Sequence, residues 1–224
     1  MVEINNADNP EVKVDNLGEE PVIDRNRCSD NTDVFTAYAV SADTDSNVLH
    51  YNLFATKYDG MQDMTGYNDP YEIAKTTVEK LGQPGQPLAD PKTRILDFGC
   101  GTGLMGIELK KAGYKSIYGL DGSSEMLAIA DSKGVYNWTW EVLVGETTLP
   151  DVTLYNADLK DSGFDAIFSS ACLIVGHFPN TCFEEMLKVL RPGGYMIFSI
   201  RDIYMSNETD NGMDYVGKLA ELEA

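Results

Sequence analysis

Short apolar runs alternate with amphipathic runs over the second half of the chain. RILDF at 94–98 and YMIFSI at 195–200 are nearly continuous apolar segments, as expected of strands buried on both faces. Strands separated by amphipathic helices predict βαβ units. The predicted fold class is therefore α/β, a doubly wound, Rossmann-like, mostly parallel sheet with helices on both faces. The expected strands are 94–98, 116–121, 139–144, 164–170 and 195–200, and the expected helices between them are 104–112, 124–133 and 181–190.

The first 46 residues are rich in Asp, Glu and Asn and poor in aromatic and branched apolar residues. This composition predicts an acidic, mostly disordered leader over 1–46, with one short helix near 33–42. The remaining residues, 47–224, are expected to form a single domain.

A helical lid over 47–82 is expected to begin that domain. Its first helix is expected to lie in the stretch that begins at Val48. Its second covers 70–81, with Asp69 as N-cap and Pro70 at the first helical position. Helical spacing puts four apolar side chains on one face of the first helix: Leu49, Leu53, Phe54 and Met61.

Composition narrows the classes of partner. Seventeen Lys and Arg against 36 Asp and Glu give a net charge of −19, which disfavours binding to nucleic acid and to anionic membranes. The chain lacks a signal-peptide pattern and an apolar run long enough to cross a bilayer, so the expected location is the cytoplasm, with the nucleus left open. The cysteines form no metal-binding pattern, so no metal is expected; they stand far apart at Cys28, Cys100, Cys172 and Cys182.

The segment ILDFGCGTGLMG carries the clearest chemical pattern. A literal G-x-G-x-x-G starts at Gly101, but the turn must begin directly after the strand, at Gly99. Counted from Gly99, the pattern has Leu104 where a dinucleotide site needs its third glycine, and Gly106 falls inside a helix. A carboxylate just ahead of the loop, Asp97, would repel a pyrophosphate. These features favour a ligand with a cationic end, such as S-adenosylmethionine, over a nicotinamide dinucleotide.

Asp121 closes the second strand, roughly 20 residues after the glycine loop, as expected of a residue that binds a ribose. A carboxylate in this position can accept hydrogen bonds from both hydroxyls of a ribose. The spacing favours this function over a simple helix cap.

Taken together, the glycine loop, Asp121, FDAIFSS and LRPGGYMIFS resemble a class I S-adenosylmethionine-dependent methyltransferase over residues 94–201. The stretch from Tyr51 to Asp59 further resembles the Y-D-x-W-A-x-x-Y-D segment of one branch, except that Asn52 and Phe54 replace its Asp and Trp. The resemblance implies that the chain moves a methyl group from S-adenosylmethionine to a small-molecule or protein acceptor. A catalytically inactive, cofactor-binding partner subunit is the alternative.

The resemblance also implies roles for individual residues. Tyr58 would reach over the cofactor from the lid, and the adenine edge would meet Glu146 or Asp158, with Glu146 favoured. His177, in the loop after the fourth strand, is a weak candidate for catalysis. The other residues expected to bind the cofactor are Asp97, Gly99, Cys100, Gly101, Gly103, Asp121, Gly122, Ser123, Met126 and Ser169.

The class I fold usually continues past the strand at 195–200 into an antiparallel hairpin, and this chain is expected to lack it. The strand at 195–200 would then present an unpaired edge. The chain is accordingly expected to be a monomer or to self-associate weakly.

Overall fold

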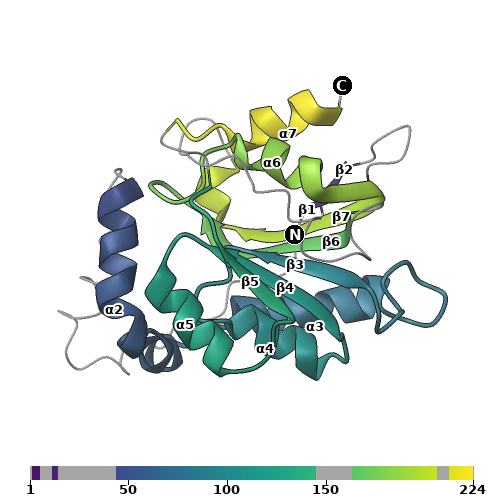
Figure 1. Cartoon of the computed structure of the whole chain (residues 1–224). Helices are drawn as coiled ribbons and strands as arrows, with labels where there is room; N and C mark the ends of the chain where they lie inside the picture. The colour runs from purple at the N-terminus through teal and green to yellow at the C-terminus, as the bar shows by residue number, and fades with distance from the viewer. Residues whose placement is uncertain (1, 6–11, 15–43, 145–162, 206–211, 224) are drawn as a thin grey trace.

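The computed structural model describes residues 2–5, 12–14, 44–144, 163–205 and 212–223. A seven-stranded sheet in the order β2-β1-β7-β6-β3-β4-β5 runs through the middle of the molecule (Figure 1). The strands from β7 to β5 in this order are parallel, which confirms the predicted doubly wound sheet. They are β3 (Arg94–Phe98), β4 (Ser116–Asp121), β5 (Trp138–Glu141), β6 (Phe164–Leu173) and β7 (Leu190–Ile200).

Helices cover both faces of the sheet (Figure 1). One layer holds α3 (Asp69–Leu81), α4 (Leu104–Lys111) and α5 (Ser124–Ser132), and the other holds α6 (Cys182–Val189) and α7 (Tyr215–Glu223). The long helix α2 (Thr44–Thr65) stands at one side of the molecule and packs on α5. A short 3-10 helix, η3 (Asp202–Tyr204), follows β7.

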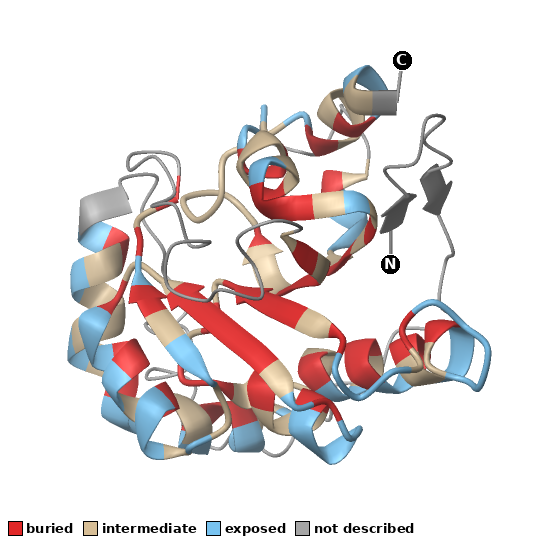
Figure 2. Ribbon diagram, turned by 45° about the vertical axis from the view of Figure 1, so that its right-hand side comes forward, coloured by how far each residue is buried: buried red, intermediate tan, exposed pale blue. Residues whose placement is uncertain are grey.

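Alternation along β3 explains the two layers. Leu96 and Phe98 are fully buried in the apolar cluster that includes Phe183 of α6 and Tyr215 of α7. Ile95 lies in the opposite cluster with residues of α3 and α4. Because successive side chains of a strand point to opposite faces, one short strand is buried from both sides (Figure 2).

The edge beside β7 differs from the expectation. Strand β1 (Val2–Asn5) pairs antiparallel with β7, Ile4 opposite Met196, and β2 (Val12–Val14) pairs with β1. The prediction of an unpaired edge on β7 is therefore wrong, and these two short segments of the predicted leader form strands. Their sequences, VEIN and VKV, alternate apolar and polar residues as a strand does. The predicted helix near 33–42 lies outside the described residues.

The lid helix α2 buries only part of the predicted apolar face. Of its four residues, Met61 is buried, but Leu49 and Leu53 are 59% and 78% exposed, and Asn47 and Ala55 are buried in addition. Polar side chains of α2 make specific contacts with the rest of the domain, so apolar spacing alone does not identify its inner face.

Several element boundaries also move. The second lid helix starts at Asp69, one residue earlier than expected, with Asn68 as N-cap. Strand β5 ends at Glu141, and β7 already begins at Leu190, so that RPGG lies within the strand.

Candidate active site

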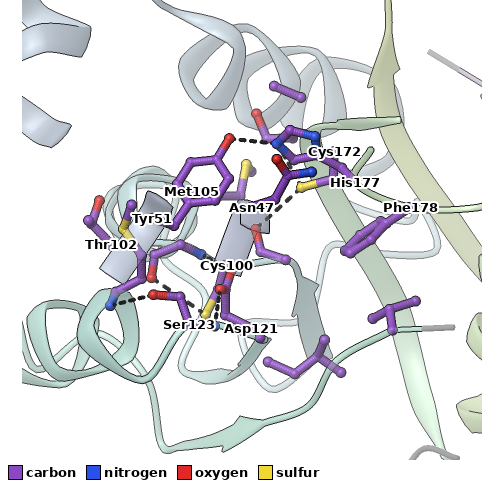
Figure 3. A pocket seen from close by; sticks show the side chains of 18 of the residues that line it. Asn47, Tyr51, Cys100, Thr102, Met105, Asp121, Ser123, Cys172, His177 and Phe178 are labelled. Carbon is purple, nitrogen blue, oxygen red and sulfur yellow. Dashed lines mark hydrogen bonds between the residues drawn. The ribbon is translucent and has the colours of Figure 1, made fainter. Parts of the chain in front are cut away.

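A cavity of about 970 Å³, including its open mouth, lies at the carboxyl ends of β3, β4 and β6 (Figure 3). Ligands of open α/β sheets bind at this edge. The loop after β3 and the start of α5 form one wall, and α2, α3 and the loop after β6 form the other. The lining residues are Asn47, Val48, Tyr51, Tyr58, Tyr67, Pro70, Gly99, Cys100, Gly101, Thr102, Leu104, Met105, Leu120, Asp121, Gly122, Ser123, Met126, Val142, Leu143, Val144, Ser170, Ala171, Cys172, Gly176, His177 and Phe178.

The loop after β3 requires glycine at several positions, and the physical reason differs from one position to the next. Gly99, Gly101 and Gly103 all have positive φ, at 83°, 50° and 89°. A Cβ on Gly99 would lie 2.6 Å from the Cys172 sulfur, so that position is closed by the protein itself. A Cβ on Gly101 would meet nothing within 4 Å, and Gly101 lines the cavity. Gly101 is therefore the position at which the backbone is open to a ligand.

The third glycine of the predicted set serves packing. Gly103 is the N-cap of α4 and does not line the cavity. A Cβ there would lie 3.1 Å from the Tyr136 ring, and a Cβ on Gly106 would lie 2.5 Å from the same ring. Both glycines make room for Tyr136.

Asp121 at the end of β4 lines the cavity and is fixed by backbone groups. Its carboxylate accepts hydrogen bonds from the N–H of Gly101 at 2.8 Å and of Ser123 at 2.9 Å. Burial raises the pKa of Asp121, and these backbone hydrogen bonds oppose that shift. Each carboxylate oxygen keeps a second acceptor site, so Asp121 can still accept hydrogen bonds from a ligand.

Asp97 does not reach the cavity, contrary to the expectation that it would meet the cationic end of the ligand. It is fully buried in the body of the domain, and the Tyr136 hydroxyl donates to its Oδ2 at 2.5 Å. Its Oδ1 has no hydrogen-bond partner among the described residues. Burial raises the pKa of Asp97 to about 7. The side chain alternates to the α4 face of β3, and this strand geometry, which the motif conceals, sends it away from the site.

The sequence leaves Ser123 and Ser124 as alternative caps of the helix expected at 124–133, and the structure has Ser123 in that position. Ser123 caps α5, and its Oγ accepts from the N–H of Met126 at 3.2 Å. The Ser123 hydroxyl donates to Asn52 Oδ1 of α2 at 2.6 Å. The cavity is lined here by Gly122, Ser123 and Met126, and Met126 is 2% exposed.

The expected role of Ser169 is contradicted by its position. Ser169 is buried inside β6, where its hydroxyl donates to the Phe98 carbonyl oxygen at 2.8 Å, and it does not line the cavity. Its neighbour Ser170 does, and bonds to the Tyr67 hydroxyl at 2.8 Å. Because side chains alternate along a strand, a shift of one residue decides which serine reaches the site.

The lid wall is rich in tyrosine. Tyr58, as expected, lines the cavity, together with Tyr51 and Tyr67. The Tyr51 hydroxyl lies 2.5 Å from His177 Nε2, and the Asn47 amide donates to the Gly176 carbonyl oxygen. Burial lowers the pKa of His177. His177 is thus brought to the cavity, as a candidate catalytic residue must be.

Three further expectations concern residues around this core of the site. Cys100 lines the cavity as a buried thiol whose pKa is raised, mainly by burial. Glu146 and Asp158 both lie outside the described residues. Within the described residues, no group of three or more His, Cys, Asp or Glu side chains could hold a metal ion, and no helix is both long and apolar enough to cross a membrane.

Sequence reasoning did not identify Asn47, Tyr51, Tyr67 or Thr102 as site residues. The Tyr51–Asp59 motif contains Tyr51, and its resemblance to a family segment was the available pointer. Thr102 stands inside the glycine loop, where its hydroxyl donates to Asp59 Oδ1 at 2.5 Å. Asn47 carries no pattern that distinguishes it from a solvent-facing residue.

Five parallel strands in the order β7-β6-β3-β4-β5, with a glycine loop after the central strand and an acidic residue ending the next, have the fold of the class I S-adenosylmethionine-dependent methyltransferases. A family model described as "Methyltransferase domain" matches residues 96–198, and the chain belongs to this class. The class takes its methyl group from S-adenosylmethionine.

Among curated proteins, the chain is similar to methyltransferase-like protein 27 of Homo sapiens. The two are 33% identical over 156 residues, which are 68% of this chain and 57% of the human protein. A malonyl-acyl-carrier-protein O-methyltransferase of Marinomonas is 34% identical over 108 residues, 47% of this chain and 37% of that protein. The chain therefore spans only 37–57% of the length of these two relatives.

Among solved structures, a TehB-like methyltransferase of Corynebacterium glutamicum superposes with a TM-score of 0.51 at 17% identity. The match covers 78% of this chain and 83% of that one. At this identity the likeness shows the fold alone.

Proposed function

We propose that this chain transfers a methyl group from S-adenosylmethionine to a small-molecule or protein acceptor. The observation that carries the proposal is the open backbone at Gly101 beside the fixed carboxylate of Asp121, both lining one cavity. A ligand can approach the main chain at Gly101 without meeting a side chain, and it can place two hydroxyls on Asp121. These residues fit the cofactor of the class.

The remaining contacts follow from the shape of the cavity. In this proposal the methionine part of the cofactor runs along the loop from Gly99 to Gly101, and Met126 packs against its adenine. Tyr58 covers the cofactor from α2. The acidic or amide contact to the adenine edge is assigned to Glu146 in preference to Asp158, which resemblance to the family supports. In this proposal the lid of 47–82 is part of the same domain, which the side chains that α2 and α3 contribute to this cavity support.

The chain's contribution to the reaction is mainly geometric. The cofactor supplies an activated methyl group, so the protein needs to align the acceptor with the carbon–sulfur bond and to exclude water. Tyr51, Tyr58 and Phe178 give the cavity an aromatic, water-poor wall. Such a site methylates whatever acceptor presents a lone pair in line with that bond.

Binding of S-adenosylhomocysteine, measured by calorimetry, tests the proposal. We expect the wild-type chain to bind it and to melt at a higher temperature in its presence. Asp121→Ala should weaken binding by about 1.5–3 kcal/mol, the value of hydrogen bonds to a charged group. Asp63→Ala, which removes an exposed carboxylate of α2, is the matched control and should bind as the wild type does. A folded wild-type chain that binds neither cofactor form would contradict the proposal.

A further inference from the structure

Tyr51 and His177 form a contact between two elements that line the cavity. Tyr51 belongs to α2 and His177 to the loop after β6, and the Tyr51 hydroxyl lies 2.5 Å from His177 Nε2. Their rings also meet edge to face, with centroids 5.4 Å apart. Both side chains line the cavity that holds Gly101 and Asp121 (Figure 3). The pair is thus inside the proposed active site.

The surroundings of His177 favour its neutral form. Nδ1 faces the Val175 carbonyl oxygen at 3.4 Å. That oxygen can only accept a hydrogen bond, so it favours the tautomer with the proton on Nδ1 and leaves Nε2 as the acceptor of the Tyr51 hydroxyl. Burial is the largest cause that lowers the pKa of His177, and the hydrogen bond with Val175 opposes this shift only in part. A neutral imidazole of this kind can take up a proton.

The wall around the pair has little charge. Tyr51, Tyr58 and Tyr67 present three phenol rings, and Asp121 is the one charged residue among the described lining residues. That part of the lining contains no lysine and no arginine. Phosphate and carboxylate groups are normally bound by such cations, and the chain carries a net charge of −19. The wall suits a neutral or cationic acceptor.

We propose that Tyr51 and His177 act together as the proton acceptor for a substrate that has an N–H or O–H nucleophile and no phosphate or carboxylate group. This inference rests on the proposed function and adds to it a pair of catalytic residues and a class of substrate. The same hydrogen bond holds α2 against the loop after β6, so that the proton acceptor is assembled only when the lid is in place.

The proton and the electrons balance as follows. The acceptor's lone pair forms the bond to the methyl carbon while the carbon–sulfur bond breaks and its electron pair stays on sulfur. The acceptor's proton passes to the Tyr51 oxygen as the Tyr51 hydroxyl proton passes to His177 Nε2. The products are the methylated acceptor, S-adenosylhomocysteine and an imidazolium, which returns its proton to solvent.

Two conservative variants test the pair, with Tyr71→Phe as the control because Tyr71 is 52% exposed and does not line the cavity. Methyl-labelled S-adenosylmethionine is incubated with the small-molecule and protein fractions of a cell extract, and the labelled product is identified by mass spectrometry. We expect Tyr51→Phe and His177→Gln to lower the rate by roughly 10²–10⁴-fold, the usual contribution of general base catalysis, and Tyr71→Phe to leave it unchanged. The affinity for S-adenosylhomocysteine should stay the same in all three variants.

The dependence on pH separates a proton acceptor from a residue that only holds the lid. The rate of Tyr51→Phe should recover as the pH rises, because solvent then removes the acceptor's proton. A second measurement needs no acceptor. The chain has two histidines, so His50→Gln leaves the nitrogen resonances of His177 alone in the spectrum, where they should report a neutral ring protonated at Nδ1 at pH 7.

The outcomes are distinct. Full activity of both variants, activity lost together with cofactor affinity, or an imidazolium at pH 7 would overturn this inference and leave the proposed function standing. A labelled product that bears a phosphate or carboxylate would overturn the substrate class. A wild-type chain that labels nothing would overturn the proposed function and this inference with it.

Discussion

The two walls of the cavity differ in how the chain builds them. The cofactor wall comes from one continuous stretch, the loop after β3 through the start of α5, and it depends on backbone conformation at Gly99 and Gly101. The lid wall is assembled from α2, α3 and the loop after β6, and it depends on side-chain contacts such as that of Tyr51 with His177. A wall made of local backbone leaves a motif in the sequence, whereas a wall made of distant side chains does not.

Side chains of α2 connect the two walls. Asn52 accepts a hydrogen bond from Ser123, and Asp59 accepts one from Thr102 and pairs with Lys133 at 2.6 Å. Further along the helix, Tyr51 and Asn47 contact the loop after β6. Polar contacts thus fix α2 on both sides of the cavity, while Leu49 and Leu53 face outward.

The largest effects should come from replacing the two glycines of the cofactor wall. Gly99→Ala should destabilise the fold by roughly 3–5 kcal/mol, because it adds a close contact with Cys172 to the cost of positive φ. Gly101→Ala should cost only about 1–2 kcal/mol of stability, the penalty of the left-handed conformation, yet weaken S-adenosylhomocysteine binding. Chemical denaturation and calorimetry measure the two quantities. Equal losses of stability in both variants would contradict the different reasons given for these glycines.

A smaller effect is expected on the pH dependence of stability, and it comes from Asp97, which is buried behind the cofactor wall. The pKa of Asp97 in the folded chain, about 7, is above that of an unfolded aspartate, so the folded state binds the extra proton between about pH 4 and 7. The stability that Asp97 contributes is therefore complete below about pH 4 and is lost by roughly 1.4 kcal/mol per pH unit as the pH rises to 7.

Asp97→Asn should remove that slope. Its melting temperature relative to the wild type should be higher at pH 8 than at pH 4, because the amide never has to carry a buried charge. Asp63→Asn, an exposed site, should show the same difference at both pH values. A difference that does not change with pH would mean that Asp97 is ionised throughout.

The smallest effect on stability is expected from the ion pair between Asp59 of α2 and Lys133, which helps to connect the two walls. Asp59→Asn should lower stability by about 1 kcal/mol, because the pair with Lys133 is partly exposed and solvent weakens it. Hydrogen exchange along α2 should become faster, since the helix loses a contact with the glycine loop. Glu108→Gln breaks an exposed pair with Lys111 within α4 and should change neither quantity measurably. Unchanged exchange in Asp59→Asn would show that the other contacts of α2 suffice to hold it.

Prediction from the sequence works where structure is local. The parallel strands, Ser123 as a helix cap and the position of Asp121 all follow from patterns within a few residues of one another. The glycine loop was also correctly counted from Gly99, because the preceding strand fixes where the turn begins.

Prediction from the sequence fails where the direction of a side chain decides whether a residue reaches the cavity. Asp97 and Ser169 lie in the strands expected to carry the site, but each points away from the cavity, because strand alternation turns them to the other side. Their position along the chain identifies the edge of the sheet and not the side chain that reaches the ligand. The pairing of β1 with β7 was missed for a different reason: no local pattern indicates a partner almost the whole chain away.

That pairing has a consequence for synthesis. Strand β1 is synthesised before its partner β7, and β3, β4, β5 and β6 lie between them in the sequence, so β1 must wait for those strands before it can pair. During that interval the growing sheet has an open side that any extended peptide could occupy.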